Sequence, residues 1–307
     1  MPRISPCLWF DDQADAAVQL YCRALPNARR LGGMTYPNEL PNPSGKPPGS
    51  TLTIDFTAGG VTFTALNGGP HFKPNATISF FVLLPTVAEV DACYAALSEG
   101  GQVLMPLDSY PWSSRYAWVT DAYGVSWQVM FDPTATQGQI VPCLMFSDAQ
   151  QGNAQAALAH YTHVFPHSAI ELTVPYQPDE AGPSSTPFTT MIKHGRAQLA
   201  GQPLIAMDSH IPHQLRFNEG VSLQIICSDQ PEVDHYWHAL GDSGAFSQCG
   251  WLKDQFGVSW QVVPQALTTW LTHPAPGIAA RAFAAMLNMQ KIDITAVEKA
   301  ARRHGEA

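Results

Sequence analysis

One hexapeptide occurs twice in the chain, and each copy carries a glutamine that could bind a ligand. Gly-Val-Ser-Trp-Gln-Val occupies residues 124–129 and recurs unchanged at residues 257–262. The amide of Gln128 or Gln261 can hydrogen-bond a ligand or a neighbouring strand. Its carbonyl oxygen can also bind a hard cation, but it supplies no negative charge. Both glutamines are therefore candidate binding residues.

Two cysteines also occupy matching positions, in the similar segments 4–10 and 140–146. A buried thiol usually packs as a small apolar group, and a nucleophilic thiol needs a base beside it. The sequence shows no base beside Cys7 or Cys143, so we expect packing roles for both. The six cysteines form no Cys-x-x-Cys pair, which indicates reduced thiols in a cytosolic protein.

Seven histidines stand where they could do chemistry: His160, His163, His235, His238, His71, His210 and His213. The first four form two pairs at i,i+3 spacing on predicted helices, where a metal pair is possible and a solvated helix face is favoured. The other three lie in predicted loops and could act as an acid or base near neutral pH, although no partner is visible. Asp208 lies in one of these loops and is the best acidic candidate in the second half.

Three ordered matches indicate that the chain is a tandem duplication. Besides the two pairs of segments above, Glu-Val-Asp at 89–91 recurs at 232–234, and Ala-Leu and Gly follow at equal distances. Trp118 and Trp251, and Asp121 and Asp254, precede the hexapeptides at equal distances. We place the first copy at 1–135, the second at 136–266 and a helical tail at 267–307.

Hydrophobic periodicity predicts the same plan twice in each copy: a strand, a helix and further strands. In the first copy we expect strands at 4–10, 51–56, 60–66, 77–84, 115–120 and 126–131, and helices at 14–25 and 87–98. In the second we expect strands near 140–146, 168–174, 187–193, 197–207, 221–227, 249–253 and 258–263, and helices at 153–164 and 232–240. Each copy therefore contains two βαβββ units.

Composition excludes several classes of protein. The 307 residues are 45% apolar and 13% charged, with a net charge of −9. An acidic chain is a poor general binder of nucleic acid, which needs basic surface. No apolar run approaches the roughly 20 residues that span a bilayer. We therefore expect a folded cytosolic protein that has neither nucleic acid nor membrane as a partner.

Three segments resemble PhnB-like proteins of the vicinal oxygen chelate (glyoxalase/bleomycin-resistance) superfamily. They are Pro-Cys-Leu-Trp-Phe-Asp at 6–11, Asp-Gln-Phe-Gly-Val-Ser-Trp-Gln-Val-Val-Pro at 254–264, and the tail around 285–294. Many relatives carry the label 3-demethylubiquinone-9 3-methyltransferase. The resemblance implies an α+β fold of tandem barrels built from paired βαβββ units, four in the chain. Two such units would enclose one cup-shaped cavity, so the chain would hold two.

Superfamily enzymes hold a divalent metal with side chains from the first and last strands of each unit. The resemblance places these positions at Ser5, Val141, Ser79, Ser222, Gln128 and Gln261. This set contains no imidazole and no carboxylate, so it is a poor metal site. We therefore predict no cofactor, with a metal-dependent lyase, isomerase or dioxygenase as the alternative. A methyltransferase is a further alternative, disfavoured because the chain has no Gly-x-Gly-x-x-Gly loop.

The resemblance and the strand alternation together predict the pocket. Ser5, Cys7 and Trp9 would face a cup, while Leu8 and Phe10 would face a helix. The full set of predicted pocket residues is Cys7, Trp9, Trp112, Gln128, Cys143, Met145, Asp208 and Gln261. Such walls favour a small, largely apolar molecule. The two cups should differ in content, and the protein should be a monomeric pseudo-dimer or a homodimer.

Overall fold

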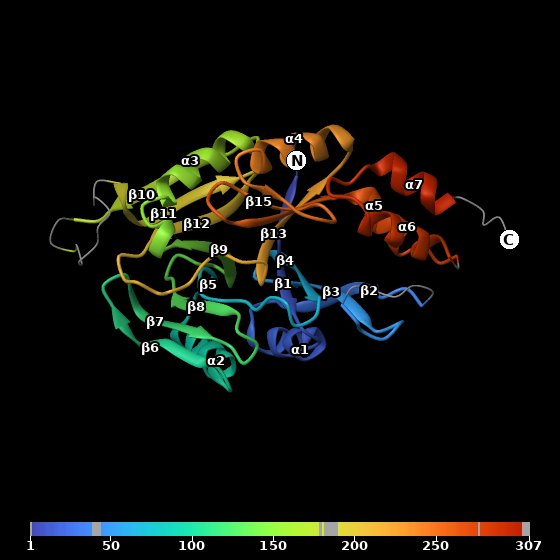
Figure 1. The fold of residues 1–307 in the computed structure, drawn as a ribbon. Coiled ribbons are helices and arrows are strands. Elements are labelled where there is room, and N and C mark those ends of the chain that lie inside the picture. The colour runs from blue at the N-terminus through green and yellow to red at the C-terminus, as the bar shows by residue number, and fades with distance from the viewer. Residues whose placement is uncertain (1, 39–43, 178–179, 181–189, 276, 303–307) are drawn as a thin grey trace.

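The computed structural model describes residues 2–38, 44–177, 180, 190–275 and 277–302. Its elements form four consecutive units and a helical tail (Figure 1). Unit 1 contains β1 (Arg3–Phe10), α1 (Ala14–Ala24), β2 (Arg29–Thr35), β3 (Thr51–Ala58) and β4 (Val61–Asn67). Unit 2 contains β5 (Ile78–Leu84), α2 (Val87–Ser98), β6 (Gln102–Tyr110), β7 (Ser113–Thr120) and β8 (Ser126–Phe131).

The second copy repeats the plan. Unit 3 contains β9 (Gln139–Phe146), the short 3-10 helix η1 (Asp148–Gln150), α3 (Ala154–Val164), β10 (Ala169–Pro175), β11 (Ile192–Leu199) and β12 (Gln202–Asp208). Unit 4 contains β13 (Val221–Cys227), α4 (Gln230–Gly241), β14 (Ala245–Phe246), β15 (Trp251–Lys253) and β16 (Ser259–Pro264). The tail forms α5 (Gln265–Leu271), α6 (Ile278–Leu287) and α7 (Ile294–Arg302).

The strands form two eight-stranded sheets, and each sheet combines one unit from each copy. Sheet A has the order β14-β15-β16-β13-β1-β4-β3-β2, so it joins unit 1 to unit 4. Sheet B has the order β10-β11-β12-β9-β5-β8-β7-β6, so it joins unit 2 to unit 3. Antiparallel pairing of β1 with β13, and of β5 with β9, makes these joints. Neither copy of the repeat therefore builds a sheet by itself.

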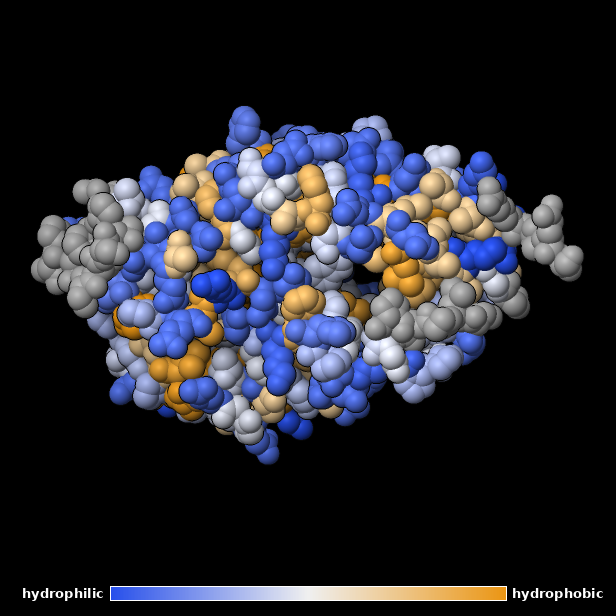
Figure 2. Space-filling view, viewed as in Figure 1, coloured by the Kyte–Doolittle hydropathy of each residue, from blue (hydrophilic) through white to orange (hydrophobic). Residues whose placement is uncertain are grey.

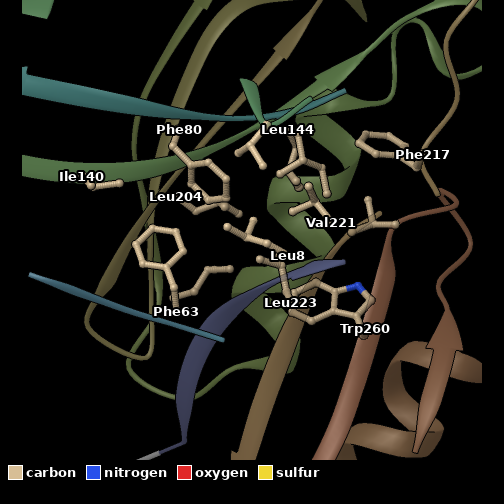
Figure 3. Close-up of a cluster of buried hydrophobic side chains, with 14 of the residues drawn as sticks. Leu8, Phe63, Phe80, Ile140, Leu144, Leu204, Phe217, Val221, Leu223 and Trp260 are labelled. Atoms are coloured by element: carbon tan, nitrogen blue, oxygen red, sulfur yellow. The ribbon is translucent and has the colours of Figure 1, made fainter. Parts of the chain in front are cut away.

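One hydrophobic core lies between the two sheets and beneath the helices. Leu8, Phe63, Phe80, Leu144 and Trp260 belong to it and come from all four units (Figure 3). Helices α1 and α2 lie along one side of the molecule, and α3 and α4 along the opposite side (Figure 1). Each sheet therefore has a second face turned away from this core. We call these the cup faces, with Cys7 on that of sheet A and Cys143 on that of sheet B.

A buried aspartate in each copy ties helix, turn and strand together. Asp121 accepts hydrogen bonds from Tyr21 Oη (2.9 Å), from Trp127 Nε1 (2.8 Å) and from two backbone N–H groups of its own turn. Asp254 repeats this arrangement with Tyr161 Oη (2.7 Å) and Trp260 Nε1 (2.8 Å). The equal spacing of the aspartate and the hexapeptide in the two copies is thus explained by the same network of hydrogen bonds in each copy.

Most predicted elements are present, and three predictions were wrong. The single strand expected at 197–207 is broken by a turn at Ala200 and Gly201, both of which have positive φ, and becomes the end of β11 and all of β12. The strand expected at 187–193 begins only at Ile192 in β11; residues 187–189 lie outside the described part. Strands β2 and β6 and the two-residue β14 were not expected: β2 and β6 are edge strands exposed along most of their length, and Pro106 interrupts the apolar residues of β6.

Candidate ligand site

The cup face of sheet A carries a hydrogen-bonded group of polar side chains. Gln261 Nε2 donates to Ser222 Oγ (2.9 Å), and Gln261 Oε1 accepts from Gln224 Nε2 (3.1 Å). Cys7 lies within hydrogen-bond reach of Gln261 and Ser222. Burial raises the pKa of the Cys7 thiol to about 12, so the group is a neutral thiol and not a nucleophile at neutral pH.

The cup face of sheet B has the same glutamine and serine but a different third partner. Gln128 Nε2 donates to Ser79 Oγ (2.8 Å), as in sheet A, while Gln128 Oε1 accepts from Tyr116 Oη (2.6 Å). Cys143 lies beside Ser79, and burial raises the pKa of its thiol to about 12. Each cup therefore combines a glutamine and a cysteine from different copies. Gln128 of the first copy shares cup B with Cys143 of the second, and Gln261 of the second copy shares cup A with Cys7 of the first.

Apolar side chains fill the cup face of sheet B. Six buried residues form a cluster there that is separate from the shared core: Phe81, Leu83, Tyr116, Val141, Cys143 and Ile205. Partly buried methionine and aromatic side chains cover this cluster: Met105, Tyr110, Trp118, Met130 and Met207. Sheet A has Gln224 and Thr64 where sheet B has Phe81 and Ile205. The two cup faces therefore differ at these two matched positions, which are polar in sheet A and apolar in sheet B.

The matching tryptophans have different partners in the two cups. In sheet B, Trp118 Nε1 donates to Ser126 Oγ (2.7 Å). In sheet A, Trp251 packs edge-on against Trp9 with ring centroids 5.9 Å apart, and the buried Ser259 Oγ has no hydrogen-bond partner among the described residues. Trp251 is therefore positioned by aromatic packing in cup A, whereas Trp118 is held against its own sheet in cup B.

A pocket of about 550 Å³ opens beside Trp9 and Trp251. Trp9 is held by a hydrogen bond from Nε1 to Gly69 O (2.8 Å) and by an edge-on contact with Phe72, whose ring centroid is 5.1 Å away. The remaining wall residues are Glu219, Ala245, Phe246, Ser247, Gln248, Cys249, Leu252, Lys253 and Leu287. The lining is mostly apolar, with an ion pair between Lys253 Nζ and Glu219 Oε1 (3.0 Å) at one side. Neither Cys7 nor Gln261 lines this pocket.

Two further predicted pocket residues, Trp112 and Met145, lie outside the pocket beside Trp9. Trp112 is 56% exposed in the turn between β6 and β7, where it stacks on Tyr110. Met145 is buried and lines a separate pocket of about 230 Å³ together with Thr77 and Phe217. Neither residue belongs to the pocket beside Trp9.

The expectation that Asp208 faces the pocket needs correction. Asp208 is the last residue of β12 and is 1% exposed. Its carboxylate accepts backbone N–H groups from Gly152 (2.7 Å), Ala154 (3.2 Å) and Ile192 (2.9 Å). Asp208 therefore fixes the start of α3, as Asn67 does for α1 by accepting Ala14 N–H. Asp208 was predicted to lie in a loop, whereas it is the last residue of β12 and its side chain lies on the face of the strand that packs against the helix.

The candidate histidines have separate partners. His235 Nε2 lies 3.1 Å from Val164 O, whereas His238 Nδ1 lies 3.0 Å from Asp242 Oδ1. His213 Nε2 lies 2.8 Å from Ser209 Oγ in the loop after β12, and burial lowers the pKa of His213. None of the seven candidates lines the pocket beside Trp9.

The side chains that the sequence resemblance places at metal-binding positions do not fit a divalent metal. In both cups the glutamine carbonyl already accepts a hydrogen bond, from Gln224 in sheet A and from Tyr116 in sheet B, and its amide N–H donates to a serine. Within the described ranges, no group of three or more histidine, cysteine, aspartate and glutamate residues could hold an ion. The donors available there are neutral hydroxyls and amides, which bind divalent cations weakly.

Two general features of the chain complete the description. All six cysteines are free thiols, as expected from their spacing. No helix in the described part of the chain is long and apolar enough to cross a membrane.

Comparison with known proteins places the chain in a family. The family model described as 3-demethylubiquinone-9 3-methyltransferase matches residues 2–130 and again residues 138–263. A Mycobacterium bovis protein described as uncharacterized is 33% identical over 142 residues, which are 42% of this chain and 82% of the relative. The relative therefore matches less than half of this chain, whereas the family model matches it in two successive segments.

Solved structures give further matches. A PhnB protein from Bacillus cereus is 28% identical, with 42% of this chain and 98% of the other covered and a TM-score of 0.38. A glyoxalase I mutant from Zea mays is 12% identical, with 86% and 92% covered and a TM-score of 0.49. With the family model matched twice and two sheets built from four βαβββ units, the chain belongs to the PhnB-like family described as 3-demethylubiquinone-9 3-methyltransferase, in tandem-duplicated form.

Proposed function

We propose that the protein binds a small, largely apolar molecule in the pocket beside Trp9 and Trp251. The observation that carries this proposal is the pocket of about 550 Å³, which is walled by aromatic and aliphatic side chains and has one ion pair at its side. A concave, mostly apolar cavity with few polar groups is the usual form of a small-molecule site. The rings of Trp9, Trp251 and Phe72 favour a ligand with a flat apolar part.

Binding without a tightly held metal is part of this proposal. The hydroxyl and amide groups on both cup faces support it, because they offer no charged donor set. A metal-dependent lyase or dioxygenase is the alternative. Metal analysis of protein purified without chelator separates the two, since a near-stoichiometric, tightly bound metal would contradict the proposal.

The family description names a methyltransferase, and this activity can be tested directly. A typical S-adenosylmethionine site lies at a Gly-rich turn between a strand and a helix of a parallel sheet. Both sheets here are mixed, and the strands that start each unit lead into α1, α2, α3 and α4 without such a turn. Calorimetry with S-adenosylmethionine should therefore give no binding signal.

The binding proposal is tested with anilinonaphthalene sulfonate, a fluorescent probe that combines an apolar ring system with one sulfonate group. Trp251→Ala removes a wall of the pocket, so the affinity should fall about tenfold, which corresponds to roughly 1.4 kcal/mol. Trp118→Ala is the matched control, because Trp118 occupies the same position of the repeat in cup B. Equal losses from the two substitutions, or a loss from Trp118→Ala alone, would contradict binding in cup A.

We also propose a cytosolic location, supported by the six free thiols. The chain already supplies all strands of both sheets, which supports a monomer that resembles a dimer. A homodimer is the alternative, and light scattering distinguishes them.

A further inference from the structure

The second copy of the repeat lacks most of one hairpin. Asp121 follows Gly101 by 20 positions in the first copy, but Asp254 follows the matching Gly244 by only 10. The missing residues belong to the hairpin at the edge of the sheet: β6 and β7 contain 9 and 8 residues, whereas β14 and β15 contain 2 and 3. Cup A therefore lacks the long strands that border cup B.

The shortening also removes a large side chain from cup A. Cys249 stands at the position that Tyr116 occupies in cup B, two residues before the matched tryptophan. In cup B, Tyr116 is buried in the apolar cluster and packs against Tyr110 and Trp112. In cup A, Cys249 lines the pocket of about 550 Å³. Cup A thus has a small thiol side chain and a short hairpin at this edge, where cup B has a buried tyrosine and a long hairpin.

The C-terminal tail is bonded to this shortened edge. The backbone N–H of Cys249 donates to Met289 O (2.7 Å), and that of Gly250 donates to Gln290 O (2.7 Å). Lys291 Nζ forms an ion pair with Asp234 Oδ1 of α4 (2.7 Å). The segment after α6 therefore takes up backbone donors that a longer hairpin would have satisfied.

Helix α6 contacts residues near both edges of sheet A. Its Leu287 lines the pocket together with Trp9 and Trp251. One helical turn earlier, Phe283 packs edge-on against Tyr36, which follows β2, with ring centroids 6.4 Å apart. In Figure 1 the tail helices lie at the same end of the molecule as β2 and β3, and Figure 2 shows a hollow in the surface at that end.

We propose that α6 is the missing wall of cup A and that Leu287 determines the size of the apolar ligand it accepts. This inference rests on the proposed binding function and adds to it the residue that limits the ligand. The tail has its own cluster of buried residues, so it is a stable wall: Leu267, Ala282, Ile292, Val297 and Ala301. Cup B, bordered by the full hairpin, has no counterpart of Leu287 on its cup face among the described residues.

Substitutions of Leu287 in the full-length chain test this inference with two probes, anilinonaphthalene sulfonate and its larger bis form. Leu287→Trp narrows the pocket and should weaken both probes at least about tenfold. Leu287→Ala widens it and should raise the affinity for the bis form relative to the smaller probe by about threefold or more. Gln290→Trp is the control, because Gln290 is exposed on the same segment and should leave both affinities unchanged.

The outcomes separate the two proposals. Suppose that both Leu287 variants bind both probes like the wild type while Trp251→Ala still loses affinity. This result would overturn the role of Leu287 and leave the proposal of binding in cup A intact. If Trp251→Ala also binds the probes with wild-type affinity, the binding proposal itself is overturned, and the inference about Leu287 with it. Leu287→Ala removes few contacts from a half-buried position, so it provides the test if Leu287→Trp does not fold.

Discussion

Asp121 and Asp254 show how strongly single residues determine this fold. Each is almost completely buried, and each carboxylate accepts four hydrogen bonds from a tyrosine, a tryptophan and its own turn. Burial raises the pKa of both carboxyl groups, although the hydrogen bonds oppose the shift. The native state therefore binds the proton of either group more tightly than the unfolded chain does.

This linkage predicts the pH dependence of stability. Between the ordinary pKa of an aspartate and the raised native value, the free energy of unfolding should fall as the pH rises, because the native state loses a proton it holds tightly. Asp121→Asn removes this contribution. The free energy of unfolding of the wild type minus that of Asp121→Asn, measured by urea titration, should therefore decrease as the pH rises.

A difference that grows with pH would mean that the four hydrogen bonds outweigh burial and that the native pKa is lowered. Asp15→Asn is a suitable control, because the Asp15 side chain is 46% exposed in α1 and forms an ion pair with Arg30. Its effect should be small at every pH, since exposed ion pairs contribute roughly 0–1 kcal/mol.

At the same scale, sequence reasoning worked where side chains alternate and failed at a boundary. Leu8 and Phe10 lie in the shared core, and Cys7 faces the other side, as the alternation predicts. Asp208 was misassigned because its role depends on N–H groups of Gly152 and Ile192, which are distant in sequence. No spacing rule shows that a carboxylate will end up between two such segments.

At the scale of elements, the helices follow local rules. Thr86 is the N-cap of α2: its Oγ1 accepts the Glu89 N–H (3.2 Å) and donates to the Glu89 carboxylate (2.7 Å). Helix α1 begins after Gln13, whose side chain makes no capping bond. The two helices occupy equivalent places in units 1 and 2 but are started differently.

Removing the cap should therefore destabilise the protein measurably. Thr86→Ala should lower the free energy of unfolding by about 1 kcal/mol. Gln13→Ala should change it by less than about 0.5 kcal/mol. Urea unfolding followed by circular dichroism measures both, and equal effects of the two substitutions would contradict a capping role for Thr86.

The strands at the edges of the sheets were the part of the fold that could not be predicted from the sequence. Strands β2 and β6 are exposed along most of their length, so no burial requirement imposes alternation on them. The shortened β14–β15 edge is visible as a ten-residue difference in spacing. That difference alone does not show that α6 replaces the hairpin, because the replacement comes from a segment forty residues later.

At the scale of the whole molecule, the sequence copies and the sheets do not coincide. Internal similarity identifies two copies, but β1 of the first pairs with β13 of the second, and β5 pairs with β9. A repeat alone is compatible with two sheets that each use one copy, and only the strand pairing decides between these arrangements. Gln128 and Cys143 consequently share a cup although they belong to different copies.

This arrangement predicts that the copies stay together when the chain is cut. A protease site inserted after Thr136, which is exposed in the connection between the copies, allows cleavage of the folded protein. Because two inter-copy strand pairs and a shared core remain, the fragments should co-elute in size-exclusion chromatography and separate only in denaturant. Separation in native buffer would contradict the cross-copy sheets.

The central claim is that cup A, with Trp9, Trp251 and Leu287 as its walls, holds the apolar ligand. Diffraction from crystals soaked with anilinonaphthalene sulfonate tests it most directly. The account predicts one probe molecule per chain in contact with the rings of Trp9 and Trp251. Density for the probe against Met130 and Met207 in cup B, with cup A empty, would contradict it.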